Sequence, residues 1–106
     1  MDKKSFEPDT FRPVVNILNE VCNGLYITNF TDKIGASEDF ARSLLHKYSD
    51  QYKKNEQIQI SNDLEFKVIL NSFKEVFKNI DDWEFDARVG ITLKDAQDLL
   101  NKIKSR

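Results

Sequence analysis

The sequence predicts a mainly α-helical fold: a compact bundle of about four helices that forms one helical domain over residues 1–106. Four segments repeat apolar residues at helical spacing. Residues that favour helix ends stand at the limits of these segments. A chain of 106 residues with 40% hydrophobic residues can bury one core unaided. Only one segment alternates like a strand, so we expect at most a small two- or three-stranded sheet beside the helices.

The first predicted helix begins near Arg12, with Pro13 in its first turn. Proline suits this position because the N–H that it lacks would have no partner within the helix. Its apolar positions are Val14, Leu18, Val21 and Leu25. We expect it to end at Asn23-Gly24, with Gly24 in the left-handed conformation of a helix C-cap. The second helix begins after Ser37, which can cap it. Its apolar face carries Phe40, Leu44, Tyr48 and Tyr52.

The third predicted helix follows a cap at Ser61 or Asn62, and Asn62 with Glu65 resembles a capping box. Its continuous apolar stripe predicts the centre of the core and consists of Phe66, Leu70, Phe73, Phe77 and Ile80. The fourth helix begins at Thr92. Its apolar face carries Leu93, Ala96, Leu100 and Ile103, and basic residues suit its C-terminal end.

Residues 82–91 alternate apolar and polar side chains, which indicates a strand with one apolar and one charged face. A lone strand cannot satisfy its backbone hydrogen bonds. We therefore expect it to pair with residues 25–28 or with the short strand predicted at 58–60. The alternation places Asp82, Glu84 and Asp86 on one exposed face.

The chain offers few groups for catalysis or for metal binding. His46 falls on the polar side of its helix, without a nucleophile or an orienting carboxylate nearby in the sequence. Cys22 lies near the end of a helix, which disfavours a thiolate, so a small buried side chain is expected. The spacing of Asp82, Glu84 and Asp86 resembles the start of a calcium loop, but later positions of that loop do not match. We therefore expect no catalytic residue, metal or cofactor.

An acidic cluster lies between Asp81 and Asp98. This segment contains six acidic residues but only two basic ones, Arg88 and Lys94. Such a run is often only a solvated face. The functional alternative is an anionic interface for a basic protein, since complementary charge speeds encounter and aromatic residues anchor interfaces. On this hypothesis the partner-binding residues are Asp82, Trp83, Glu84 and Asp86.

A basic group on the second helix gives the alternative function, an adaptor or regulator that binds nucleic acid. It consists of Arg42, Lys47, Lys53 and Lys54, with Tyr48 and Tyr52 nearby. The tyrosines fall on the apolar face, which favours core packing for them. A net charge of −2 also disfavours a dedicated nucleic-acid binder.

Location can also be predicted from composition. One cysteine excludes a disulfide within the chain, and no apolar run approaches the length of a membrane span. The N-terminal residues are too polar for a secretory signal. We therefore expect a cytoplasmic protein that does not enter a membrane.

The C-terminal quarter resembles the ending of small bacterial immunity proteins from polymorphic and contact-dependent toxin systems. The shared pattern is an aromatic-rich strand at Trp83–Ile91, an Arg88-x-Gly90 turn and a capped amphipathic helix from Thr92. The resemblance implies an inhibitor that binds one protein partner, a basic toxin domain that is often a nuclease. It carries over no catalytic residues. A small enzyme or metal protein is the third and weakest hypothesis, because catalytic groups are sparse.

Overall fold

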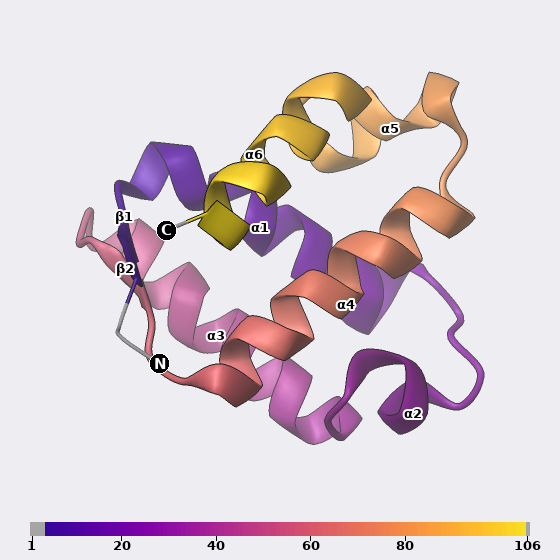
Figure 1. Cartoon of the computed structure of the whole chain (residues 1–106), viewed down its shortest axis with the longest axis horizontal. Helices are drawn as coiled ribbons and strands as arrows, with labels where there is room; N and C mark the ends of the chain where they lie inside the picture. The colour runs from indigo at the N-terminus through magenta and orange to yellow at the C-terminus, as the bar shows by residue number, and fades with distance from the viewer. Residues whose placement is uncertain (1–3, 106) are drawn as a thin grey trace.

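A computed structural model describes residues 4–105 and shows a mainly helical molecule with one small sheet (Figure 1). Helix α1 lies in the middle and contacts α3, α4 and α5. The described part contains six α-helices, more than the four expected, and a π-helical turn η1. The elements are β1 (Lys4–Phe6), α1 (Pro8–Asn19), η1 (Glu20–Gly24), α2 (Phe30–Ile34), α3 (Glu38–Lys53), β2 (Ile58–Ile60), α4 (Asp63–Asn79), α5 (Asp82–Val89) and α6 (Leu93–Ser105).

Helix α1 begins at Pro8, earlier than the predicted start near Arg12. The proline in the first turn of α1 is therefore Pro8, and not Pro13 as predicted. Pro13 instead lies inside the helix, where it cannot donate to the carbonyl of Asp9 four residues earlier. The helix continues directly into η1, so the predicted stop at Gly24 is correct in position.

The left-handed conformation predicted for Gly24 is wrong. Left-handed glycines occur instead at Gly35 and Gly90, which end α2 and α5. At Gly24 an added Cβ would lie 2.6 Å from Oε1 of Glu20, so the Glu20 side chain would have to move to admit one.

The caps predicted for the longer helices are confirmed. Ser37 accepts a hydrogen bond from the Phe40 N–H at 3.1 Å at the start of α3. Asn62 accepts one from the Glu65 N–H at 2.9 Å at the start of α4. The Glu65 carboxylate accepts a hydrogen bond from the N–H of Ser61. In a regular capping box it would accept from the N–H of the N-cap residue, which is Asn62.

The sheet has two strands, and its pairing differs from the prediction. The strand expected at residues 58–60 is present as β2, but it pairs antiparallel with β1, in a register that joins Lys4 to Ile60 and Phe6 to Ile58. Residues 25–28 form no strand and lead into α2. The strand predicted at residues 82–91 is wrong: this segment forms α5 and the turn into α6.

The core lies between α1, α3, α4 and the two C-terminal helices. Phe73, Val76 and Ile69 of α4 are fully buried, which confirms that this helix contributes to the centre of the core. Phe77 is only partly buried and lies 5.8 Å from the rings of both Phe73 and Phe85. The contact of Phe77 with Phe85 joins α4 to α5 and helps to set which residues of α5 face solvent.

Candidate functional site

The residues predicted to bind a partner lie on α5, near the upper right of Figure 1. Phe85 and Val89, four positions apart, form the buried side of this short helix. Trp83 is 78% exposed, which is unusual for so large an apolar side chain. Asp82 and Asp86 are exposed one turn apart. We call Asp82, Trp83 and Asp86 the α5 surface.

Glu84 does not share the α5 surface, and the expectation of three carboxylates on one face is wrong. A residue two positions from Asp82 and Asp86 points to the opposite side of a helix, whereas in a strand it would share their face. On that side, Oε2 of Glu84 lies 3.6 Å from Nη1 of Arg88. Arg88 also forms an ion pair with the buried carboxylate of Glu20 in η1. Glu84 therefore belongs to an internal charge network.

The basic residues of α3 are largely occupied by contacts within the protein. Arg42 donates to the carbonyl of Cys22 and to the side chain of Asn23, both at 2.7 Å, and so caps the end of η1. Lys47 binds the carboxylate of Glu65 at 3.0 Å. Only Lys53 and Lys54 remain as exposed cations of the predicted group. The surface available for nucleic acid is thus smaller than the sequence suggested.

His46 and Cys22 lie where the sequence placed them. His46 is exposed, and Cys22 is buried in the middle of η1. Burial raises the pKa of the Cys22 thiol, Arg42 opposes this and Glu38 adds to it. Burial therefore disfavours the thiolate.

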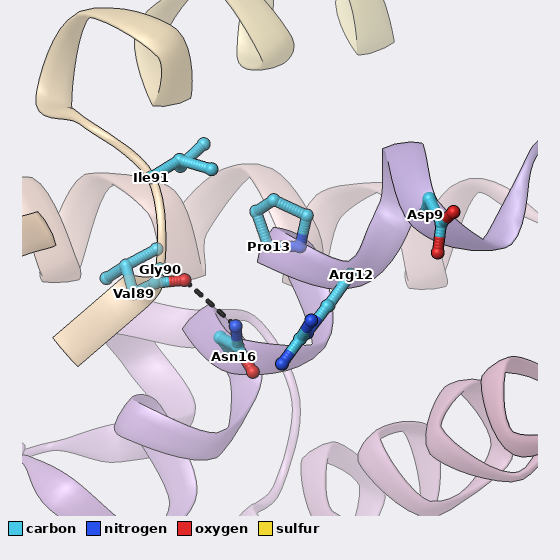
Figure 2. A pocket seen from close by; sticks show the side chains of 7 residues that line it. All are labelled: Asp9, Arg12, Pro13, Asn16, Val89, Gly90 and Ile91. Carbon is cyan, nitrogen blue, oxygen red and sulfur yellow. Dashed lines mark hydrogen bonds between the residues drawn. The ribbon is translucent and has the colours of Figure 1, made fainter. Parts of the chain in front are cut away.

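A pocket that the sequence analysis did not anticipate lies between α1 and the turn from α5 to α6. Its volume is about 460 Å³, and it is lined by Asp9, Arg12, Pro13, Asn16, Val89, Gly90 and Ile91. Figure 2 shows Pro13 facing Ile91, with the Arg12 side chain beside Asn16. The Asn16 amide donates to the Val89 carbonyl at 2.9 Å and fixes the turn to α1.

No local sequence signal points to this pocket, because its two sides are more than 70 positions apart, as in the bond from Asn16 to Val89. Within residues 4–105, no three His, Cys, Asp or Glu side chains gather closely enough to hold a metal ion. In the same range, no helix has both the length and the apolarity needed to cross a membrane. Comparison with protein-family models, curated proteins and solved structures finds no significant match for this chain.

Proposed function

We propose that this protein is a non-catalytic, cytoplasmic, immunity-type inhibitor that neutralises one toxin by binding it through the α5 surface. The observation that carries the proposal is the exposure of Trp83, at 78%. Solvating an indole ring is unfavourable, whereas burying it in a partner's pocket releases that cost. Tryptophan is also among the residues that contribute most to protein interfaces.

Charge around Trp83 favours a basic partner. Asp82 and Asp86 make no ion pair with any residue in the described part of the chain. Asp82 lies in the first turn of α5, where a carboxylate also stabilises the helix dipole, but Asp86 lies beyond that turn. Two unpaired carboxylates beside an exposed aromatic ring complement a cationic surface and accelerate its approach.

A toxin that acts on nucleic acid fits this requirement, since its active site must attract phosphates. The resemblance to immunity proteins supports the same class of partner. Two parts of that resemblance have counterparts in the structure: the Arg88-x-Gly90 turn and the helix capped by Thr92, which accepts from the Asp95 N–H at 3.1 Å. The aromatic-rich part is helical, so the resemblance supports the proposal through the turn and the last helix.

The test begins with a pull-down that identifies the partner, followed by association rates for the parent and for Asp82→Lys with Asp86→Lys. We expect the double variant to associate about tenfold more slowly at low salt, with a smaller difference at moderate salt. The matched control is Glu84→Gln, on the same helix but off the α5 surface, and it should leave the association rate nearly unchanged. Circular dichroism confirms that each variant is folded.

Trp83 supplies an independent measurement because it is the only tryptophan in the chain. Its fluorescence should shift to shorter wavelength when the complex forms, and Trp83→Ala should raise the dissociation constant about 30-fold or more, as for an interface hot spot. Binding that is unaffected by all these changes would contradict the proposal. Salt-sensitive binding to DNA or RNA that is lost in Lys53→Gln with Lys54→Gln would instead favour the nucleic-acid adaptor.

A further inference from the structure

We propose that the outer face of α4, together with the loop of residues 25–29, binds single-stranded nucleic acid. The face carries three exposed lysines, Lys67, Lys74 and Lys78, which we call the α4 lysine stripe. Beyond the first turn of α4, every exposed charged residue of this helix is one of these lysines. The stripe is separate from the α5 surface, and the proposal does not depend on the function proposed above.

The spacing of the α4 lysine stripe places its side chains in one row. Lys74 and Lys78 follow Lys67 by about two and about three helical turns, so all three side chains leave α4 on the same side. That side is opposite to the fully buried residues Ile69 and Val76. At the rise of an α-helix the row is about 17 Å long, which suits the backbone of a few nucleotides.

The charges of the α4 lysine stripe are not neutralised within the described part of the chain, where none of the three lysines forms an ion pair. Lys78 lies in the last turn of α4 and stabilises the helix dipole, but Lys67 and Lys74 lie before that turn. Lys74 and Lys78 are also one turn apart, and like charges at this spacing destabilise a helix slightly. A row of phosphates opposite the stripe removes this repulsion.

Tyr26 supplies an aromatic ring near the stripe. At 93% it is the most exposed aromatic side chain of the described residues. Tyr26 lies in the loop of residues 25–29, which joins η1 to α2, and both of these elements contact α4. In Figure 1 the loop runs from near the C-terminal end of α4 to α2. A ring with this exposure can stack on a base of a strand that follows the lysines.

Two hydrogen bonds hold this loop and α2 in place. The Asn71 side chain of α4 donates to the Ile34 carbonyl of α2 at 2.9 Å. Lys33 of α2 donates to the Thr28 hydroxyl in the loop at 3.2 Å, and it adds a further cation two positions from Tyr26 in the loop. The loop is therefore fixed beside α4 before a strand arrives, so less freedom is lost on binding.

The combination of a row of cations with one aromatic ring favours single strands over other polyanions. A membrane surface requires a larger apolar area than one tyrosine provides. A duplex leaves no base face free for Tyr26. The exposed carboxylate of Asp82 follows Lys78 by four positions, so we expect the strand to run from Lys78 towards Lys67, away from α5. These contacts use phosphates and a base face, which DNA and RNA share.

The experiment is a fluorescence-anisotropy titration of a labelled thymidine strand of about 15 nucleotides with the full chain. Because the net charge of the protein is −2, we expect weak binding at low salt, with a Kd of about 10–100 µM. Three phosphate contacts predict a slope of about −2 for the logarithm of affinity against that of salt concentration. Lys74→Gln with Lys78→Gln should weaken binding about tenfold and reduce the slope to about −0.7.

Tyr26 gives a second readout that is independent of charge. Tyr26→Ala should weaken binding of the strand about fivefold or more and leave the salt slope unchanged. Tyr26→Phe should bind as the parent does, because stacking requires the ring and not the hydroxyl. The same strand paired with its complement should bind the parent and Tyr26→Ala equally.

The matched control is Lys53→Gln with Lys54→Gln, which removes the same charge at the C-terminal end of α3 and should leave binding unchanged. Circular dichroism confirms that each variant is folded. The proposal is overturned if the strand gives no saturable change up to about 500 µM protein, or if the control loses as much affinity as the stripe variant. It is also overturned if vesicles of phosphatidylglycerol bind the protein and the strand does not.

Discussion

At the scale of single residues, Glu65 is the clearest case of a buried charge fixed by its neighbours. Its carboxylate accepts hydrogen bonds from the Ser61 N–H at 3.0 Å, from Lys47 at 3.0 Å and from the Tyr48 hydroxyl at 3.0 Å. Burial alone raises the pKa of Glu65, but these bonds outweigh it and hold the pKa below its usual range. Burial of the Tyr48 hydroxyl raises the pKa of Tyr48, and the charge of the Glu65 carboxylate and its hydrogen bond add to this rise.

We predict that Glu65→Gln lowers the free energy of unfolding by about 1–3 kcal/mol near neutral pH, because hydrogen bonds to a charged group are weakened or lost. Since the folded-state pKa of Glu65 is depressed, its contribution is present above the unfolded-state pKa and is lost as pH falls through the folded-state pKa. The difference between parent and variant should therefore shrink as pH falls below about 4. Urea unfolding at several pH values measures this.

The control for this experiment is Glu56→Gln, which changes an exposed glutamate near β2 that makes no ion pair with any residue in the described part of the chain. Its substitution should change stability little at any pH. A Glu65→Gln variant as stable as the parent at neutral pH would show that the carboxylate network adds nothing to stability.

At the scale of elements, α5 shows why alternation misled the sequence analysis. Phe85 and Val89 are the only buried residues of α5. They lie four positions apart, a spacing that fits both a strand face and a helix face. Trp83 and Ala87 completed the alternation but are exposed. The better signals were those of helix ends: acidic residues in the first turn, Arg88 in the last turn and Gly90 directly after it.

Gly90 gives a prediction at this scale, because its φ of 90° is a conformation that residues with a Cβ rarely adopt. Gly90→Ala should lower the free energy of unfolding by about 1–2 kcal/mol. Gly90→Asn should lose less, since asparagine tolerates this conformation better. Thermal unfolding of the three proteins measures both effects. Equal losses for alanine and asparagine would mean that contact with Asn16, and not backbone strain, dominates.

At the scale of the whole molecule, the sequence predicted the helical class and a helix that contributes to the centre of the core. It did not predict that β1 pairs with β2 and contacts the end of α6. The caps at Ser37 and Asn62 are local features, and the structure confirms them. Of the predicted apolar stripe of α4, Phe73 and Ile80 are buried, whereas Phe66, Leu70 and Phe77 are only partly buried. Strand β1, the pocket and the ion pair of Glu20 with Arg88 depend on residues far apart in the chain. No periodicity within a short window carries that information.

The core yields the prediction at this scale. Phe73 is fully buried, so Phe73→Ala should lower the free energy of unfolding by about 3–5 kcal/mol. Phe77→Ala should cost less, because Phe77 is already partly exposed, although it contacts the rings of both Phe73 and Phe85. Urea unfolding of both variants gives the two values. A larger loss at Phe77 would show that the contact between α4 and α5 matters more to stability than burial in the core.

The pairing of β1 bears on how the protein folds during synthesis. Lys4 donates to the Ile103 carbonyl at 2.8 Å, across 99 positions of sequence, while Phe6 pairs with Ile58 in β2. In Figure 1 the end of α6 lies next to this sheet. A nascent chain therefore cannot complete these contacts until the segment with Ile103 has left the ribosome. Closing so long a loop also costs more entropy than forming a helix. Strand β1 is thus among the last elements to reach its final contacts, and a chain released before Ile103 would leave one edge of its core open.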